Sequence, residues 1–508
     1  MANRLDYAYR RLVNVLGPGR VKRGPFESLL YGHDFAALPK ALALTFDVEP
    51  DFVVLPRTTE EVVRVVRFQA ESGLPIVPRG GGTGMYGGAV PNRGGILIDF
   101  RMMNRVVNVD AANRTITVEA GCTWQEAFDR AWAAGLFLPV YPTFAISSTV
   151  GGWINSGGVG VGAMKYGSPR DLLRNLEVVL EDGTVLQTGS DRVDLGGSPT
   201  DLGPLFVGSE GTLALATRAT LRLHPRPEEI RPLAYAFPTL AAALPALRAL
   251  AASPVRPYHV ALLDPSHLEL VKAVHRDAPE PAAIALVVFE GPKDENAEGE
   301  KVVDALVATG GGAKLAAETA KDLWDDRRFA YPMRRISGGL VVCEAIVPLG
   351  KLGEALAQVR ALRDRLKMEV GVHAAAVDAN SVAVYPYFLD DEASPMPPAR
   401  LAFAVAFRER MLDLGGHPMG IGLLLAFQVA AIHGNAHRFF RPIKETLDPQ
   451  GRFNAGKMHE IRTKYDFPGL RRVPLSLAAF PIRVLGALKR IGPRDNLARR
   501  YTQHGGAR

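Results

Sequence analysis

The chain has 508 residues, 47% of them hydrophobic and 22% charged, which is typical of a soluble globular protein with two to four domains. Its two cysteines, Cys122 and Cys343, are too few for a disulfide scaffold or most cysteine-based metal sites, and they favour a reducing, cytoplasmic location.

The net charge is +7, but it is unevenly placed, because residues 461–508 hold eleven Lys and Arg against two acids. The remainder of the chain is near neutral, so we do not expect it to bind nucleic acid. The N-terminus lacks the apolar core of a signal peptide, and no apolar run reaches the length of a membrane span.

The first half of the chain is expected to hold an N-terminal helical segment over residues 1–47 and a strand-rich domain over residues 48–227. A hydroxyl cap at Thr58, acids in the first turn and apolar residues at helical spacing predict a helix that ends at Gly73. Strands are expected next, over Ile96–Asp99, Val106–Val109 and Thr115–Glu119, and then a helix over Thr123–Ala134. Two further strands are expected around an Asp-Gly turn within Leu176–Leu186.

Residues 228–458 change to a repeated alternation of strands and helices, which predicts a sheet with helices packed on one face and suits a substrate or cap domain. Strands are expected at Leu233–Phe237, Val260–Leu263, Ile284–Phe289, Leu340–Val347 and Val382–Tyr387, and helices at Leu240–Ala252, Glu295–Thr309, Lys351–Lys367 and Pro398–Leu414. The fold class expected is therefore α+β, with a cap domain built on a helix-covered antiparallel sheet and a tail over residues 459–508.

The stretch Pro78–Gly95 has eight glycines in eighteen residues and contains a literal G-x-G-x-x-G at Gly82–Gly87. A dinucleotide-binding Rossmann turn would need a helix after these glycines, but the next residues, GGAVPNRGG, cannot form one. A strand follows instead, at Gly95–Phe100. The loop is therefore expected to hold an anion with backbone amides alone, and an irregular surface loop is the alternative.

Further motifs follow in a fixed order along the chain. They are Pro78–Gly84 (PRGGGTG), Ser148–Gly152 with Asn155–Gly158, Lys165–Gly167, Leu176–Gly183, Val207–Leu213 (VGSEGTL) and Leu447–Lys457 (LDPQGRFNAGK). Together they resemble the flavoproteins that share a vanillyl-alcohol-oxidase-type, or PCMH-type, FAD-binding domain. The order is most similar to the branch of glycolate oxidase subunits and D-lactate dehydrogenases, over roughly residues 45–458.

The resemblance implies that FAD is the cofactor. A second glycine-rich loop is expected at Ser147–Gly158. In that family the first loop, at Pro78–Gly95 here, surrounds the FAD pyrophosphate. The second loop runs along the cofactor toward the flavin ring, and both loops use many amides and little side-chain bulk. Carried over position by position, the resemblance places these residues at the cofactor: Pro78, Gly80, Gly81, Gly82, Thr83, Gly84, Met85, Pro142, Ser148, Thr149, Gly152, Asn155, Gly157, Gly158, Tyr166, Glu210, Asn454 and Lys457.

No residue stands where a covalent flavin link would be expected. Some relatives attach FAD through His or Cys, but Thr83 and Gly84 occupy the part of the first loop where a histidine would be expected. Ser147 and Ser148 offer no thiol, and Cys122 is interpreted as a small packing residue. We therefore expect FAD to be bound non-covalently.

The metal-binding pattern of the branch is broken in this chain. Many members hold a divalent metal beside the flavin with a Gly-Asp-Gly-Asn-x-His segment and a Glu-His-Gly-x-Gly segment, whose histidine serves as base. The nearest matches place Val382 at the first histidine position and Pro418 and Met419 at the Glu-His pair. None of these side chains can replace the expected ligands, so no metal site is expected, and the simplest case for D-lactate is lost with it.

Replacement candidates for catalysis lie nearby in the sequence. His417 is one residue out of register with the Glu-His-Gly-x-Gly pattern. It could act as the base, or it could pack beside Pro418. His433 and His437 would share a face if they lie on one helix, although Gly434 makes that helix uncertain, and capping or surface roles are the alternative. Arg327, in the segment WDDR, matches the family's Trp-x-x-Arg element, whose arginine can pair with a substrate carboxylate, so an anionic substrate is favoured.

The function expected is an FAD-dependent oxidoreductase that oxidises a hydroxy acid or related alcohol by hydride transfer to flavin N5 and passes electrons to a separate acceptor, a subunit or a quinone. Two alternatives stay open. One is a subunit that binds FAD for electron transfer without turning over a small molecule. The other is a non-redox flavoenzyme that resembles alkylglycerone-phosphate synthase, although the His-rich run of that family is absent.

The basic tail is a separate question. Within it, Pro481–Ile491 could form a helix with one apolar stripe flanked by Arg483 and Arg490. Such a helix suits peripheral contact with an anionic membrane, here its inner face, or docking of an acidic acceptor subunit. The alternative is that the helix packs back on the body.

Overall fold

A computed structural model describes residues 2–36, 46–195, 198, 200–273, 280, 282–327, 337, 339–390, 398–426 and 429–458. These residues form two compact units. Unit 1 takes the residues up to Val159, from Ser168 to Arg226, and from Gly420 onward, and unit 2 takes Gly160–Gly167 and Pro227–Met419. The tail over 459–508, with its expected helix, lies outside the described residues. Among the helices that are described, none has both the length and the apolar character needed to cross a bilayer.

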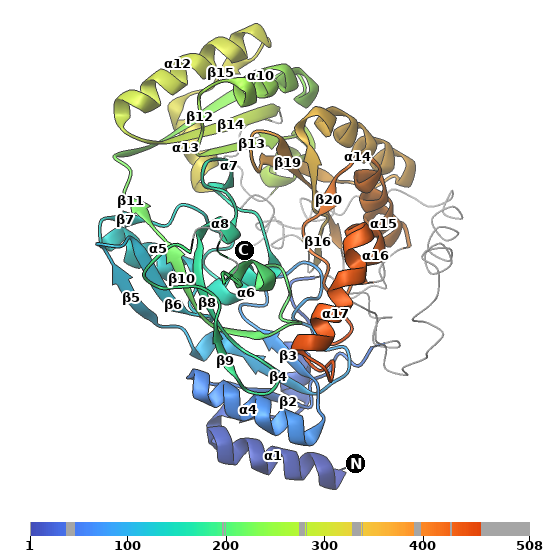
Figure 1. Ribbon diagram of the computed structural model, residues 1–508. Coiled ribbons are helices and arrows are strands. Elements are labelled where there is room, and N and C mark those ends of the chain that lie inside the picture. The colour runs from blue at the N-terminus through green and yellow to red at the C-terminus, as the bar shows by residue number, and fades with distance from the viewer. Residues whose placement is uncertain are drawn as a thin grey trace, which may run out of the picture. The chain divides into compact units, whose positions relative to one another are not determined.

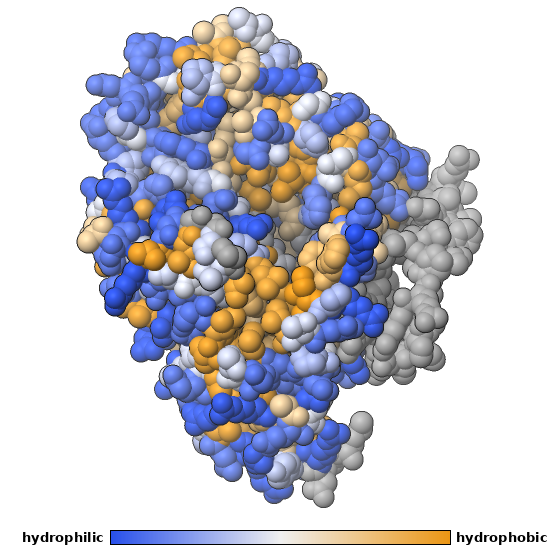
Figure 2. Space-filling model, in the orientation of Figure 1, coloured by the Kyte–Doolittle hydropathy of each residue, from blue (hydrophilic) through white to orange (hydrophobic). Residues whose placement is uncertain are grey.

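Unit 1 contains a small sheet in the order β1 (Val21–Lys22), β2 (Phe52–Val54), β4 (Ile96–Asp99) and β3 (Ile76–Arg79). Helices α1 (Ala2–Leu16) and α4 (Thr59–Ser72) bury their apolar sides in one core with these strands, and their outer surface is mostly hydrophilic (Figures 1 and 2). The predicted helix is confirmed, because Thr58 caps the Glu61 amide and Gly73 ends α4 in a left-handed conformation at φ 72°. The strand β4 after the first glycine-rich loop is confirmed too, so no Rossmann turn is present there.

A second sheet of unit 1 is antiparallel throughout. Its order is β5 (Val106–Asp110), β6 (Thr115–Glu119), β10 (Leu215–Arg222), β8 (Leu173–Val179) and β9 (Val185–Gln187). The predicted strand pair around the Asp-Gly turn is β8 and β9, with Gly183 at φ 81° in the turn. The smaller elements are α2 (Pro25–Tyr31), α5 (Trp124–Ala133), β7 (Leu136–Phe137), α8 (Pro169–Leu172), α9 (Gly203–Phe206) and β11 (His224–Pro225).

The second glycine-rich segment differs from its prediction as a loop. It contains a short helix, α6 (Val150–Ser156), which begins at the cap residue Thr149 and ends at Gly157 with φ 66°. A Cβ on Gly151 would lie 2.6 Å from the Cβ of Ala120, so this glycine allows α6 to pack closely on the end of β6. The sequence reading missed the helix because glycine pairs are poor helix formers, and packing overrides that preference here.

The C-terminal segment of unit 1 returns to the first sheet. It contains α16 (Val429–His433) and α17 (His437–Leu447), which are separated by a 3-10 turn at Gly434–Ala436. His433 and His437 therefore do not lie on one continuous helix, and the break is at Gly434, the glycine that made such a helix uncertain, with φ 52°. After α17, Phe453 pairs with Ile76 of β3, and its side chain is fully buried.

Unit 2 is built on one antiparallel sheet, which confirms that part of the expected fold. The strand order is β15 (Ala313–Lys314), β12 (Glu229–Phe237), β14 (Ala283–Gly291), β13 (His259–Leu263), β18 (Gly371–Ala376), β19 (Ser381–Asp390), β17 (Ala345–Pro348) and β20 (His417–Pro418), and β16 (Gly339–Val342) also pairs with β19. The single strand expected over Leu340–Val347 is thus two strands. The break lies opposite Pro386, which has no amide hydrogen to donate.

Alternate side chains of this sheet point to opposite faces, one of which packs in a large apolar core. The other face also carries buried apolar side chains, such as Val288 and Leu286, and we name it the polar face for its rings of His259, His373, Tyr385 and Tyr387. Val260, Val372 and Val384 belong to a large core that includes helices α10 (Leu240–Ala252), α12 (Lys293–Thr309), α14 (Leu352–Leu366) and α15 (Pro398–Asp413), as Figure 1 shows for α10 and α12 beside β12 and β14. All four helices were predicted. The sequence reading missed α7 (Ala163–Tyr166), α11 (Pro265–Lys272) and α13 (Ala317–Asp325), and α11 and α13 carry residues that pack beside the polar face.

Candidate functional site

The two glycine-rich segments of unit 1 lie in direct contact. A Cβ on Gly80 would lie 2.1 Å from Thr149 Oγ1, and a Cβ on Gly81 would lie 1.9 Å from the Ser147 carbonyl oxygen. The Thr83 hydroxyl lies 2.9 Å from the Ser148 hydroxyl, within hydrogen-bond distance. Any side chain at Gly80 or Gly81 would collide with the second segment. The two glycines are therefore needed for this contact, and a ligand depends on them only through it.

The first loop leaves backbone donors available. In the part of the chain that the structure describes, the amides of Gly81, Gly82, Thr83 and Gly84 donate to no carbonyl or side chain. Gly82 adopts φ 66°, a conformation that glycine takes without strain. A run of free amides in a turn is an anion-binding concavity, which fits the pyrophosphate of FAD.

The C-terminal segment fixes the far end of the same loop. Lys457 is 1% exposed, and its ammonium group donates to the carbonyls of Gly88 and Val90 at 2.9 and 2.6 Å and to Asn454 Oδ1 at 2.6 Å. Asn454 in turn donates to the carbonyls of Gly88 and Glu210. All three donors of Lys457 are thus used inside the protein, so the structure gives Lys457 and Asn454 a supporting position behind the loop.

Two buried carboxylates accompany Lys457. Glu210 accepts from the amides of Ile421 and Gly422 at 2.8–2.9 Å, and Asp34 accepts from the Ala36 amide at 2.9 Å. Burial raises the pKa of both carboxyl groups, and these amides oppose the rise. Burial also lowers the pKa of Lys457 to about 7, against the opposing field of Glu210 and Asp34. Arg79 also acts on Asp34, so the charge cluster beside the cradle contains two acids and two cations.

The other residues expected at the cofactor lie around α6, in β3 and the first loop, after β7, and in α7 of unit 2. The Thr149 hydroxyl accepts from the Gly152 amide at 3.3 Å, and Asn155 donates to the Gly151 carbonyl at 2.9 Å. Gly157 and Gly158 follow α6, and a Cβ on Gly158 would meet Trp153 at 2.3 Å. The remaining members are Pro78 at the end of β3, half-buried Met85 in the first loop, buried Pro142 after β7, and Tyr166 in α7 of unit 2.

Tyr166 is engaged within unit 2. Its hydroxyl donates to the Glu290 carboxylate of β14 at 2.6 Å, and Lys165 pairs with the same carboxylate at 2.5 Å. Burial and the Glu290 charge raise the pKa of Tyr166. Its assignment as a cofactor-binding residue stays a prediction.

Cys122 lies next to α5 with no exposed surface, and burial raises the pKa of its thiol to about 12. A thiol in this state is an inert packing group, since the thiolate is the reactive form.

The polar face of the unit 2 sheet gathers several imidazole and phenol rings. His373 of β18 stacks on Tyr385 of β19 with centroids 4.7 Å apart, and His267 Nδ1 of α11 lies 2.7 Å from the Tyr387 hydroxyl. Burial lowers the pKa of His267 to about 3 and that of His373 well below its usual value, so both rings are neutral at neutral pH.

His259, the first residue of β13, lies on the same face and is 3% exposed. Neither of its ring nitrogens has a hydrogen-bond partner among the described residues. Burial and, next, the Arg327 cation lower the pKa of His259 to about 4. A buried polar group without a hydrogen-bond partner lowers the free energy of unfolding by about 1–3 kcal/mol.

Arg327 follows α13 and is partly buried. Its guanidinium lies 4.5 Å from the centre of the Trp324 ring and donates to the Trp324 carbonyl at 2.9 Å. Trp324 also packs against the His259 ring at 6.0 Å. The predicted Trp-x-x-Arg element therefore presents a cation held by its own tryptophan, next to a neutral histidine.

The histidines proposed as bases lie in different units. His417 belongs to β20 of unit 2, is exposed, and has its Nδ1 2.7 Å from the Pro418 carbonyl oxygen. His433 ends α16 of unit 1 and contacts the Phe440 ring at 4.5 Å. Neither placement tests a catalytic role, which stays a prediction for both.

Val382 stands where the resemblance would place a metal-binding histidine. Val382 is 1% exposed and belongs to the apolar core of unit 2. Within the described ranges, no group of three or more His, Cys, Asp or Glu side chains is arranged to hold a metal ion.

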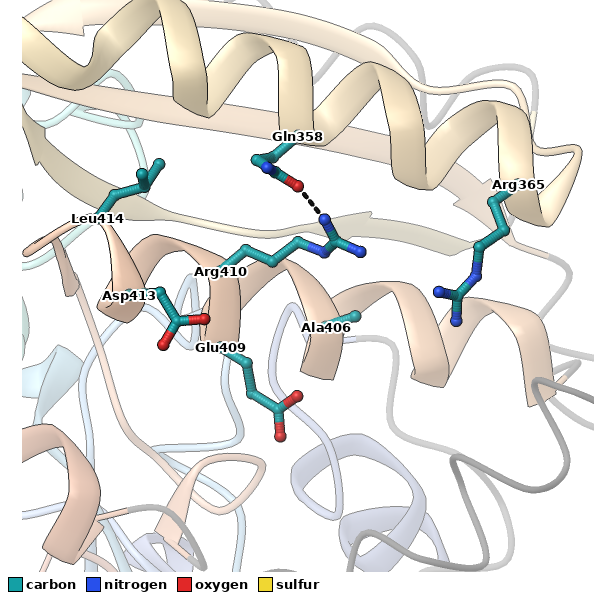
Figure 3. Close-up of a pocket in the computed structure, with 7 residues that line it drawn as sticks. All are labelled: Gln358, Arg365, Ala406, Glu409, Arg410, Asp413 and Leu414. Carbon is teal, nitrogen blue, oxygen red and sulfur yellow. Dashed lines mark hydrogen bonds between the residues drawn. The ribbon is translucent and has the colours of Figure 1, made fainter.

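A cavity of about 500 Å³ lies between α14 and α15 (Figure 3). Its lining includes Arg365, Glu409 and Asp413, and Arg410 donates to Gln358 across it. None of the sequence motifs contributes a residue to this cavity, so it is not the candidate site.

Sequence reasoning missed His259, because a single histidine at the start of a strand gives no signal by itself. It also missed the buried position of Asp34, which stands outside every motif. Tyr258 and His259 stand directly before the apolar run Val260–Leu263, and nothing in that local pattern distinguishes them as site residues.

Comparison with known proteins identifies the two domains of the chain and its relatives. Residues 50–189 match the family model described as an FAD binding domain, and residues 226–458 match the model described as FAD linked oxidases, C-terminal domain. The chain is 29% identical over 462 residues to the glycolate oxidase subunit GlcD of Bacillus subtilis, covering 88% of this chain and 96% of that protein. It is 32% identical over 417 residues to a D-lactate dehydrogenase of Archaeoglobus fulgidus, covering 80% and 90%.

Among solved structures, p-cresol methylhydroxylase with bound substrate matches with a TM-score of 0.76. The match covers 90% of this chain and 97% of that one at 18% identity, which shows a common fold. The expected PCMH-type fold is confirmed.

Proposed function

We propose, from the premise that the chain belongs to the family of FAD-linked oxidases, that it oxidises a small 2-hydroxy acid. The family itself makes the protein an FAD-dependent oxidoreductase. The substrate class is supported by two relatives that are named for glycolate and for D-lactate.

The observation that carries the flavin-dependent chemistry in this proposal is the cradle of free amides at Gly81–Gly84, packed against Ser147–Thr149. Backbone donors of the first loop would hold the FAD pyrophosphate, while Lys457 and Asn454 keep the loop in shape from behind. When bound, FAD supplies an acceptor for the hydride that leaves the substrate carbon.

The protein's own contribution to substrate binding is assigned to Arg327. A guanidinium held over Trp324 keeps its planar fork in a fixed orientation, which suits bidentate pairing with a carboxylate. A small anion with a carboxylate is therefore the preferred substrate.

Three further parts of the proposal concern the cofactor link and the partners. FAD is held non-covalently, since Cys122 is buried and the first loop offers Thr83 and Gly84 where relatives use histidine. Electrons pass to a separate acceptor, a protein subunit or a quinone. The basic tail supports peripheral contact with the inner face of a membrane or with that acceptor, and the protein otherwise resides in the cytoplasm.

Anaerobic titration of the holoprotein with glycolate, D- and L-lactate, larger 2-hydroxy acids, polyols and aldoses tests the function. The flavin absorbance should bleach with one or more 2-hydroxy acids and persist with the polyols and aldoses. Bleaching only by a neutral alcohol would contradict the acid substrate. A flavin that no compound reduces, yet that accepts electrons from a partner protein, would favour the electron-transfer subunit.

A further inference from the structure

His259 differs from His267, another buried histidine of the polar face, in how its ring nitrogens are satisfied. His267 has the Tyr387 hydroxyl 2.7 Å from Nδ1. The two ring nitrogens of His259 have no partner in the described part of the chain, although the residue is 3% exposed. A buried hydrogen-bonding group without a partner is destabilising, so its presence points to a ligand that supplies the partner.

The surroundings of His259 define the chemistry of such a ligand. The Trp324 ring packs against His259 with centroids 6.0 Å apart, and the same indole carries the Arg327 guanidinium at 4.5 Å. The indole of Trp324 therefore contacts both the neutral ring of His259 and the cation of Arg327. A molecule with a hydroxyl next to a carboxylate offers the matching groups, an O–H for the imidazole and an anion for the guanidinium.

We propose that His259 accepts the hydrogen bond of the substrate hydroxyl and takes its proton during oxidation. This step rests on the function proposed above. The O–H bond breaks and its proton moves to an imidazole nitrogen, while the C–H bond breaks and its electron pair leaves with the hydrogen as hydride for the oxidised flavin. The C–O bond becomes a double bond, and the imidazolium later releases its proton to water. The products are a 2-oxo acid and the reduced flavin.

The charge state of His259 agrees with this role. Burial and the Arg327 cation lower its pKa to about 4, so the ring is neutral at neutral pH and has a free lone pair. A bound carboxylate offsets the positive charge of Arg327, which is the second reason for the low pKa of His259. The pKa of His259 should therefore rise when substrate is bound, and the ring becomes a stronger base. The neighbouring titratable ring, His373, is itself neutral.

A pair of matched ligands isolates the hydroxyl contact. Anaerobic, photoreduced holoprotein binds a hydroxy acid without oxidising it, so calorimetry can compare D-lactate with propionate and glycolate with acetate. The variants are His259→Phe, which keeps a ring of similar size without nitrogens, and His267→Phe, a control at a buried histidine of the same face. Bound flavin content reports folding for each variant, and His259→Asn replaces His259→Phe if the latter fails to hold flavin.

The wild type should prefer each hydroxy acid over its deoxy analogue by on the order of tenfold or more, because the site has a group built for the hydroxyl. His259→Phe should bring this ratio close to one and leave the affinity for propionate and acetate unchanged, and flavin reduction should be slowed. His267→Phe should keep the ratio. An unchanged ratio in His259→Phe, or equal affinities in the wild type, would overturn the role of His259. Failure of the function itself shows separately, as a wild-type flavin that no hydroxy acid bleaches.

Discussion

A Cβ atom on Gly81 would stand 1.9 Å from the carbonyl oxygen of Ser147, closer than any contact between a carbon and an oxygen atom allows. The two glycine-rich segments therefore pack backbone to backbone at this point. The Thr83–Ser148 hydrogen bond lies next to the contact and depends on it.

Gly81→Ala should therefore lose most of its bound FAD, because the methyl group pushes the two segments apart and displaces the amides of Gly82–Gly84. The control is Gly19→Ala in unit 1, outside the cradle, whose added Cβ would meet no atom within 4 Å. Flavin absorbance relative to protein absorbance measures occupancy in both. Equal flavin contents in the two variants would show that the contact does not shape the cradle.

Lys457→Met should destabilise unit 1 by about 3–5 kcal/mol, because it leaves the buried carboxylate of Glu210 without its cation, whereas Asp34 keeps the field of Arg79. The carbonyls of Gly88 and Val90 lose a donor as well, so flavin occupancy should fall. Thermal unfolding and flavin content measure the two effects.

The double variant Lys457→Met with Glu210→Gln provides the check, since removal of one charge should restore part of the stability. Lys301→Met is the surface control, because Lys301 is exposed and pairs only at the surface with Glu298. If the double variant is no more stable than Lys457→Met, the buried charges are not the cause.

Much of the fold could be predicted because local signals and packing agree there. Thr58, Glu61 and Gly73 mark the ends of α4, and the structure uses each in the predicted way. Similarly, α10 spans the predicted residues Leu240–Ala252. The helix α6 could not be predicted, because its glycine pair disfavours a helix until Ala120 packs against it.

The candidate site was predicted unevenly for a similar reason. Motifs indicated that Asn454 and Lys457 belong near the cofactor, but only the structure shows that their donors are used on Gly88 and Val90. The pairing of His259 with Trp324 joins residues far apart in sequence, from a strand and a helix. No spacing rule links such residues, so this part of the site required the fold.

Arg327→Met should raise KM for an acidic substrate by roughly 10- to 100-fold, the effect of losing a hydrogen bond to a charged group. For the neutral amide of the same hydroxy acid, the change should be less than about twofold, since no carboxylate is present to pair. Arg248→Met, at an exposed arginine of α10, is the control and should alter neither. A similar rise for acid and amide would assign Arg327 a structural role beside Trp324.

Acid precipitation of the purified protein should release intact FAD into the supernatant. Cys122 is a buried thiol with a raised pKa, and neither Thr83 nor Ser148 is a group that links to flavin in relatives. Flavin absorbance in the pellet and in the supernatant measures the distribution. Yellow colour that remains with the denatured polypeptide would contradict non-covalent binding.

The stability of the protein should fall as the pH is lowered from about 6.5 to 4, in part because of His259. Its pKa is lowered to about 4 in the folded protein, whereas an unfolded histidine has a pKa near 6.5. Between these values the unfolded chain binds a proton that the folded chain does not, so stability rises with pH across this window and is lost toward its acid end. One such histidine changes the free energy of unfolding by at most about 1.4 kcal/mol per pH unit.

His259→Phe removes this contribution together with the unsatisfied nitrogens. Its thermal midpoint should therefore equal or exceed that of the wild type at pH 7, and its advantage should grow as the pH falls toward 4. Buried carboxyl groups titrate in both proteins, so the difference between the two midpoints isolates the histidine. A variant that is less stable than the wild type at every pH would mean that the His259 ring serves packing, and the ligand-binding explanation of its free nitrogens would lose its energetic basis.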